Sequence, residues 1–377
     1  MMIRPDMLLL GGAGRNVGKT EFACEVIRRY SPHVPVVAAK ITTVKEGGDS
    51  CPRGGQGCGV CSSLAGEYFL MEEFGDGDHK DTARMKQAGA DRVFWLRVRQ
   101  AALSSGINAM LAEIPSGTCL VCESNSARQI VEPGSFLVFR EANSTAMKTS
   151  CAAVQEHADR FIAFNGQSWD FPPDRCQFQN GRWLVPADAS AAILAGGQSR
   201  RMGRDKSLLP YRGHTLIEHI RSQVQPLVDE LLVGGEGEKY RFLNLPLISD
   251  EQPGLGPLMG ILSCLRAARH EHLLVTACDV PELPVDFLRL LLRRARTCDI
   301  VMASDSDDGR PEPLLAVYNR RLIPAIETIL KNGGRRMIEL FQHPGVQGAL
   351  LPLPPGNLYR NINTPEEYQR MNDHDQL

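Results

Sequence analysis

The chain has 377 residues, which is long for a single hydrophobic core and suits two domains. Its formal net charge of -2 and its 23% of charged residues exclude the strongly basic composition typical of proteins that bind nucleic acids or anionic membranes. No apolar run is long enough to cross a bilayer, the start does not read as a signal peptide, and the eleven cysteines are scattered. We therefore expect reduced thiols and a cytoplasmic protein.

Short β-rich runs alternate with helical patterns through both halves of the chain. In the first half the runs are MLLLGG, PVVAAKIT, RVFWLRV, TCLVCES, SFLVFRE and RFIAFNG. In the second half they are AAILAGG, ELLVGG, LPLISD, LLVTACD, IVMAS and LLAVYN. Such continuous apolar runs are typical of parallel strands covered by helices on both faces. The pattern predicts two doubly wound, three-layer α/β domains, residues 1–186 and 187–377, divided by a proline-rich stretch.

The first glycine-rich loop is GGAGRNVGKT, residues 11–20. It follows the strand predicted at MLLL and precedes a helical pattern, which is the context of a phosphate-binding P-loop, although Ala13 stands where glycine is usual. Lys19, next to Gly18, would reach the β- and γ-phosphates of a nucleotide, and Thr20 would ligate Mg²⁺. We predict nucleotide binding here; a helix entry without this function is the alternative.

A cysteine-containing loop, DSCPRGGQGCGVCSS, follows the second predicted strand. Cys51, Cys58 and Cys61 resemble half of a zinc or iron–sulfur site. No fourth ligand is evident, which favours free thiols in a glycine-rich loop, and both interpretations stay open.

The first half resembles the P-loop adaptor proteins of molybdopterin-guanine dinucleotide biosynthesis. The resemblance lies in the glycine-rich loop and in HKDTARMKQAGADRVFWLRV, residues 79–98. It implies GTP binding and would place Glu123, at the end of TCLVCES, near the phosphates. The residues alone equally allow Glu123 to be a satisfied carboxylate at a strand end. The adaptors typically carry a longer acidic-to-glycine element where ESNS stands here.

The second glycine-rich loop, LAGGQSRRMGRDK, covers residues 194–206. Gly196 and Gly197 let the backbone turn tightly after a strand and present its amides to an anion. Arg201 and Lys206 add positive charge that can reach a triphosphate. The alternative is a solvated basic turn, but the motifs that follow fit one chemistry.

Two carboxylates follow later strands. SDEQPGLGPLMG places Asp250 after one strand, and LLVTACDVPELP places Asp279 at the C-terminal end of another. Ligands bind at this edge of such sheets, and a carboxylate beside a phosphate-binding loop is a good Mg²⁺ ligand. Asp279 could instead form a turn before Pro281.

Near the C-terminus, NLYRNINTPEEY places Asn361 and Asn363 two residues apart, hence on one face if the segment is extended. Each could contact a ligand or form a turn. Thr364 is a plausible N-cap for a helix that opens with Pro365.

These second-half motifs resemble the molybdenum cofactor guanylyltransferase family, from Ala189 to the C-terminus. The resemblance implies transfer of GMP from GTP to molybdopterin, with release of pyrophosphate. Carried over by motif, the residues that would bind GTP are Leu194, Ala195, Gly196, Lys206, Asp250 and Asp279, with Asp279 also holding Mg²⁺. The LAGG form favours guanylyl over cytidylyl transfer. LLVGGEGEKY has Gly234 and Gly235 where the family usually has an asparagine.

We interpret the chain as a P-loop NTPase-like adaptor domain followed by a Rossmann-like nucleotidyltransferase domain. Lys206 and Arg201 would stabilise the charge of the triphosphate, and Asp279 would hold Mg²⁺. Rival interpretations are cytidylyl transfer to molybdopterin, nucleotidyl transfer to a sugar phosphate, and a non-enzymatic GTP-binding adaptor that delivers the cofactor to an apo-molybdoenzyme.

Overall fold

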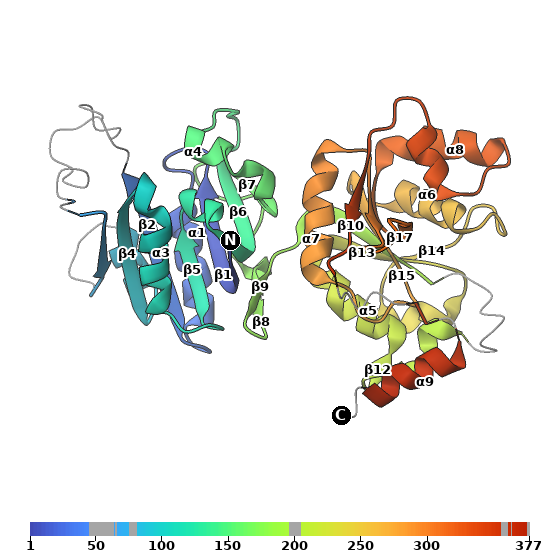
Figure 1. Cartoon of the computed structure of the whole chain (residues 1–377), viewed down its shortest axis with the longest axis horizontal. Coiled ribbons are helices and arrows are strands. Elements are labelled where there is room, and N and C mark those ends of the chain that lie inside the picture. The colour runs from blue at the N-terminus through green and yellow to red at the C-terminus, as the bar shows by residue number, and fades with distance from the viewer. Residues whose placement is uncertain are drawn as a thin grey trace. The chain divides into compact units, whose positions relative to one another are not determined.

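The computed structural model describes residues 1–44, 64, 66–74, 81–195, 205–355, 361, 362 and 364–374. The chain divides into two compact units, Met1–Val185 and Pro186–Leu377, next to the boundary expected from the sequence (Figure 1). Among the described helices, none is long and apolar enough to cross a membrane.

The first unit is built on a sheet with the strand order β3-β4-β2-β5-β1-β6-β7. Its strands are β1 (Met2–Gly12), β2 (Val36–Val44), β3 (Tyr68–Glu72), β4 (Arg92–Arg99), β5 (Cys119–Glu123), β6 (Val131–Glu141) and β7 (Arg160–Phe164). All neighbouring pairs are parallel except β3 with β4, which pair antiparallel at one edge. Because the carboxyl ends of parallel strands meet at one edge, the loops after β1, β2 and β5 come together there.

Helices cover both faces of this sheet. They are α1 (Lys19–Tyr30), α2 (Asp81–Gln87), α3 (Leu103–Ala112) and the short α4 (Thr149–Ala152). Successive residues of β1 point to opposite faces: Leu9 packs in the cluster that contains α3, and Leu8 in the cluster that contains α1 and α2. A hairpin of β8 (Gln177–Gln179) and β9 (Arg182–Leu184), which the sequence did not predict, adds Trp183 to the α1 side.

The second unit has a sheet with the strand order β14-β13-β10-β15-β17-β16-β18. Its strands are β10 (Ala187–Leu194), β13 (Val228–Gly234), β14 (Leu247–Ile248), β15 (His272–Ala277), β16 (Ile300–Ser304), β17 (Pro311–Asn319) and β18 (Gly348–Pro352). A separate small hairpin consists of β11 (Pro210–Tyr211) and β12 (His214–Thr215). The predicted α/β fold with parallel strands is thus confirmed in both units, with antiparallel additions.

The main departure from the predicted parallel sheet is β17. It runs antiparallel to both of its neighbours, β15 and β16. Only a short turn separates β16 from β17, and a parallel pair needs a longer crossover. The Asp305 carboxylate accepts the amides of Asp307 and Asp308, and Gly309 has a φ of 69°, so the segment closes as a tight turn.

Helices again form the outer layers of the second unit. They are α5 (Leu216–Val224), α6 (Pro257–Ala267), α7 (Val285–Arg294), α8 (Ile323–Lys331) and α9 (Pro365–His374). Figure 1 shows α5 and α7 on one side of the sheet and α6 and α8 on the other. Residues 258–265 of α6 are all buried, and this helix shares one hydrophobic cluster with α8.

Candidate active site

Three parallel strands of the second unit end together where the second glycine-rich loop begins. The Ala195 amide donates to the Gly234 carbonyl oxygen at 2.7 Å, and the Cys278 amide donates to the Leu194 carbonyl oxygen at 3.2 Å. These contacts join the ends of β10, β13 and β15. Leu194, Ala195 and the neighbour of Cys278, Asp279, therefore lie at one edge, where sheets of this type bind ligands.

Lys206 and Asp279, far apart in the sequence, meet at this edge. Lys206 Nζ lies 3.7 Å from Asp279 Oδ2, and the two side chains are 16% and 24% exposed. Burial raises the pKa of Asp279, and the nearby Lys206 ammonium only partly opposes this effect. An ammonium group and a carboxylate placed together can bind a triphosphate with its metal ion. The ammonium group suits the phosphate oxygens, and the carboxylate suits the metal.

Asp250 follows β14 and lies close to α6. A Cβ placed at Gly260 would be 3.2 Å from Asp250 Oδ1 and 3.8 Å from Leu194 Cδ2, so both side chains border the first turns of this helix. Burial raises the pKa of the Asp250 carboxyl, and Glu236 raises it further. The residue before α6, Gly256, has a φ of 81°, a backbone conformation that favours glycine. The structure therefore brings Asp250 beside Leu194, on the α6 side of the edge.

The C-terminal segment is attached to the backbone of Asp279. The amide of Ile362, a buried residue, donates to the Asp279 carbonyl oxygen at 2.8 Å, and the neighbouring Asn361 is exposed. Thr364 Oγ1 accepts the Glu367 amide at 3.2 Å, and Glu367 Oε2 accepts the Thr364 amide at 3.0 Å. This reciprocal pair confirms the predicted cap of α9. The hydrogen bond from Ile362 fixes the chain just after Asn361, so Asn361 lies next to Asp279 in the fold.

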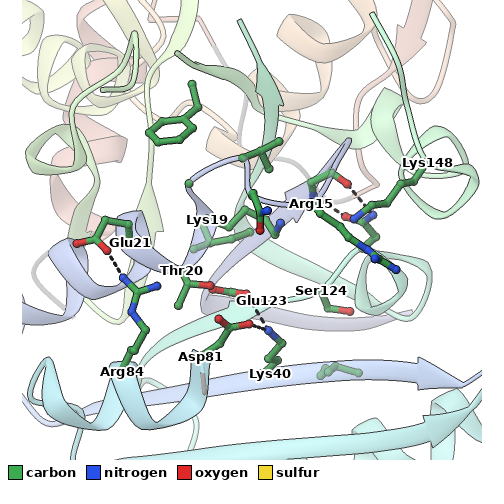
Figure 2. Close-up of a pocket in the computed structure, with 18 residues that line it drawn as sticks. Arg15, Lys19, Thr20, Glu21, Lys40, Asp81, Arg84, Glu123, Ser124 and Lys148 are labelled. Carbon is green, nitrogen blue, oxygen red and sulfur yellow. Dashed lines mark hydrogen bonds and ion pairs between the residues drawn. The ribbon is translucent and has the colours of Figure 1, made fainter. Parts of the chain in front are cut away.

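The first unit contains a cavity of about 550 Å³ at the carboxyl edge of its sheet. Figure 2 shows Lys19, Thr20 and Glu123 among its lining side chains. Lys19 is the first residue of α1, and Gly18 before it has a φ of 73°. A glycine-rich loop that ends in such a helix presents its amides to an anion. The residues predicted to bind phosphate in this unit therefore line one cavity.

Cations and carboxylates face each other in this cavity. Burial lowers the pKa of Lys19, and Glu123 opposes the shift. Lys40 pairs with Asp81 and lies 3.7 Å from Glu123 Oε2 (Figure 2). Glu123 is only 4% exposed, and its Oε1 has no hydrogen-bond partner among the described residues. The unpartnered Oε1 favours a ligand-binding role for Glu123 over a fully satisfied carboxylate, and this role stays a prediction.

Lys148 and Asn125 are among the residues of this cavity that were not singled out from the sequence. Lys148 Nζ donates to the Gly14 carbonyl oxygen at 2.7 Å, and the Lys148 amide donates to the Ala13 carbonyl oxygen at 2.9 Å. Asn125 holds Gly12 through its side-chain amide. Both residues fasten the first glycine-rich loop from segments distant in the sequence, and no local motif marks them.

Comparison with known proteins concerns the second unit. A family model described as "MobA-like NTP transferase domain" matches residues 191–346. A probable molybdenum cofactor guanylyltransferase of Carboxydothermus hydrogenoformans is 36% identical over 187 residues, which cover 48% of this chain and 94% of the relative. The molybdenum cofactor guanylyltransferase of Shewanella putrefaciens is 34% identical over 190 residues, 49% of this chain and 97% of the relative. The chain belongs to the molybdenum cofactor guanylyltransferase family. The predicted family is thereby confirmed.

A solved structure is also similar to this chain. Molybdopterin-guanine dinucleotide biosynthesis protein A of Archaeoglobus fulgidus is 24% identical, with a TM-score of 0.42, and covers 50% of this chain and 98% of its own. The range matched by the family model lies within the second unit, so the resemblance of the first unit to the adaptor proteins stays a prediction.

Several predicted site residues lie outside the described part of the chain. They are Gly196, Gly197, Arg201 and Asn363, and the same holds for the possible metal ligands Cys51, Cys58 and Cys61. Their roles stay predictions.

The departure from the family's usual asparagine has a steric counterpart. A Cβ placed at Gly234 would lie 2.5 Å from Leu194 Cδ2 and 3.0 Å from Cys264 Sγ. Real Cβ atoms essentially never come as close as 2.5 Å to another atom, so any side chain at position 234 would require Leu194 to shift.

Two further side chains near this edge clarify the chemistry. Burial raises the pKa of Cys278 to about 12, which keeps the thiol protonated and unsuited to act as a nucleophile. The His219 side chain is 15% exposed and lies against the Tyr211 ring and Glu282.

Proposed function

We propose that the second unit transfers GMP from GTP to molybdopterin, forming molybdopterin guanine dinucleotide and pyrophosphate. The observation that carries the proposal is the 3.7 Å approach of Lys206 Nζ to Asp279 Oδ2 at the carboxyl edge of the sheet. Relatives named molybdenum cofactor guanylyltransferase match over 94% and 97% of their own length, which supports the same activity here.

The reaction needs positioning and charge neutralisation more than proton transfer. An oxygen of the terminal phosphate of molybdopterin attacks the α-phosphorus of GTP, the bond to the bridging oxygen breaks, and pyrophosphate leaves with the electron pair. This phosphate is already ionised at neutral pH, so no general base is required. Lys206, together with Arg201, would neutralise charge on the triphosphate, and Asp250, Asn361 and Asn363 would contact the nucleotide.

Asp279 fits the role of a magnesium ligand. Its carboxylate is three-quarters buried beside the Lys206 ammonium group, and burial raises its pKa, so a divalent cation would offset the cost of its ionised form. Bound Mg²⁺ would supply charge neutralisation for the α- and β-phosphates. The carboxylate would also orient the triphosphate towards Lys206.

The deciding experiment measures pyrophosphate release from GTP, CTP and ATP, each offered with Mg²⁺ and molybdopterin. We expect release with GTP alone and its loss in Asp279→Ala. Asp188→Ala is the matched control, because this exposed carboxylate lies at the opposite, amino end of β10. Release with CTP would indicate a cytidylyltransferase of the same fold. GTP binding without release of pyrophosphate from any nucleotide would favour a non-enzymatic adaptor.

For the first unit we propose a P-loop nucleotide site that binds GTP. It is supported by the position of Lys19 and Thr20 at the start of α1 and by Glu123 Oε1, which has no hydrogen-bond partner in the described chain. Thr20 and Glu123 offer oxygen ligands of the kind that Mg²⁺ prefers. The site would serve an adaptor role towards apo-molybdoenzymes.

The first-unit site is tested by titrating GTP into the full chain that carries Lys206→Ala, so that binding at the second unit is weakened. Adding Lys19→Ala should abolish the remaining binding, and Lys86→Ala, at the end of α2, should leave it unchanged. Binding that survives Lys19→Ala would contradict the proposal.

A cytoplasmic location is also proposed. Eight cysteines of the described chain are free thiols, and seven of them are buried. Buried free thiols suit a reducing compartment.

A further inference from the structure

The turn that carries Lys206 is fastened to the sheet by a buried tyrosine. Tyr240 belongs to the 3₁₀ turn Glu238–Leu243 that follows β13, and it is fully buried. Its hydroxyl lies 3.0 Å from the Ala195 carbonyl oxygen and 3.1 Å from Asp205 Oδ2. Ala195 and Asp205 lie near the two ends of the second glycine-rich loop, residues 194–206. The hydroxyl has a single hydrogen, which it can donate to either oxygen or share between them, so Tyr240 lies within hydrogen-bond distance of both sides of the loop.

Asp205 in turn shapes the backbone at Lys206. Its Oδ1 accepts the Ser207 amide at 3.1 Å and the Ser207 hydroxyl at 2.6 Å, which caps the 3₁₀ turn Lys206–Leu208. Ser207 is fully buried, and its Oγ lies 3.0 Å from the Tyr240 hydroxyl. The direction in which Lys206 leaves the backbone is thus set by this cluster.

The protonation states in the cluster are well matched. Burial raises the pKa of Tyr240, so its hydroxyl keeps its hydrogen at neutral pH. Burial opposes ionisation of Asp205, but hydrogen bonds from Lys239 and Ser207 outweigh it and lower the pKa of this carboxyl. A neutral phenol facing an ionised carboxylate forms a charge-assisted hydrogen bond, which is stronger than a neutral one.

We propose that Tyr240 and Asp205 are positioning residues that hold Lys206 opposite Asp279 for guanylyl transfer. The inference rests on the proposed function of the second unit. A lysine side chain is long and flexible, so it meets a triphosphate at low entropic cost only where its backbone is fixed. A link between the two sides of a loop also removes part of the loop-closure entropy.

The first test is the kinetics of Tyr240→Phe, which removes only the hydroxyl group. We expect kcat for pyrophosphate release to fall about tenfold, while KM for GTP changes by less than about twofold. Tyr318→Phe is the matched control: Tyr318 is also fully buried, and its hydroxyl donates to the Pro313 carbonyl oxygen at 2.8 Å, outside the cluster. Equal losses of kcat in the two variants would overturn the proposal.

The second test asks whether Tyr240 acts through Lys206. In a Lys206→Ala background, Tyr240→Phe should no longer change the rate, because the residue that it positions is gone. Asp205→Asn should likewise lower kcat in the unaltered chain and leave the rate unchanged in the Lys206→Ala background. A further fall of about tenfold in the double variant would show an independent role and overturn the proposal.

The third test needs no turnover. Hydrogen exchange of the segment 206–209 should be about tenfold faster in Tyr240→Phe than in the unaltered chain and unchanged in Tyr318→Phe, because a bond that holds the turn is lost. Unchanged exchange in Tyr240→Phe would overturn the positioning role. If the unaltered chain releases no pyrophosphate, the proposed function fails, and this exchange measurement still decides whether Tyr240 holds the turn.

Discussion

Asn125 and Gly12 hold each other at the carboxyl edge of the first sheet. The Gly12 amide donates to Asn125 Oδ1 at 2.7 Å, and Asn125 Nδ2 donates back to the Gly12 carbonyl oxygen at 3.1 Å. The side chain thereby satisfies both backbone groups of a residue at the start of the first glycine-rich loop. This loop is fixed to the segment after β5 before any ligand binds.

Asn125→Ala should therefore weaken GTP binding by the first unit about tenfold, because the loop loses two hydrogen bonds that pre-organise it. Isothermal titration of the full chain carrying Lys206→Ala measures the change. Asn165→Ala is the control, since the Asn165 side chain also accepts two backbone amides, those of Gln167 and Ser168, in a turn after β7. Equal weakening in both variants would contradict the role of Asn125.

Much of the architecture could be predicted because it is encoded locally. Each glycine-rich loop follows an apolar strand, and Lys19 and Asp279 stand at strand or helix ends where their position follows from α/β topology. Asn125 and Tyr240 could not be predicted in this way. Their partners, Gly12 and Ala195, are distant in the sequence, so only the packed fold brings them together.

The antiparallel strand β17 shows a different limit. Its apolar sequence fits a buried strand of either direction, and the connection to β16 decides the direction. Asp305 and Gly309 are typical turn residues, but the direction of the strand was predicted from the apolar runs alone.

Gly234→Ala should lower the free energy of unfolding of the second unit by about 1–3 kcal/mol, the usual cost of overpacking a core. The reason is the 2.5 Å distance between the new Cβ and Leu194 Cδ2. Urea unfolding followed by circular dichroism measures it, with Gly66→Ala as control, because the nearest atom there would be 3.9 Å away. Unchanged stability would mean that Leu194 moves aside without cost.

Lys206→Ala should lower kcat for pyrophosphate release by at least about 100-fold, the usual effect of removing a group that stabilises developing charge. The chain should stay folded, because Lys206 is not among the buried core residues of the second unit. Lys331→Ala, at the end of α8, controls for loss of a positive charge in the same unit. An unchanged rate would exclude the assigned role of the loop.

Replacing Asp279 should change stability and activity in opposite directions. Burial raises its pKa, so the folded chain binds this proton more tightly than the unfolded chain. The free energy of unfolding then falls as the pH rises from the usual aspartate range through the raised pKa, and the penalty persists at neutral pH. Asp279→Asn avoids ionisation and should raise the melting temperature at pH 7–8 by on the order of a few degrees while abolishing turnover.

The pH dependence separates this effect from a general change in stability. The advantage of Asp279→Asn should shrink as the pH falls and disappear below the usual aspartate pKa of 3.8, where the carboxyl becomes protonated in both states. Asp305→Asn is the control of opposite sign: backbone hydrogen bonds from Asp307 and Asp308 lower the pKa of Asp305, so its ionised form stabilises the fold. Asp305→Asn should have a lower melting temperature than the unaltered chain at neutral pH, and this difference should shrink at acidic pH.

A ligand completes the test of Asp279. Mg²⁺ with GTP should raise the melting temperature of the unaltered chain more than that of Asp279→Asn, because a cation that binds only the folded carboxylate stabilises the folded state. Calorimetric melting of both variants from pH 4 to pH 8, with and without Mg²⁺ and GTP, measures all of these differences. Two outcomes would contradict this role: a lower melting temperature of Asp279→Asn than of the unaltered chain at pH 8, or an equal rise in melting temperature of both on adding Mg²⁺ and GTP. In either case the carboxylate is a structural group and another residue must hold the metal.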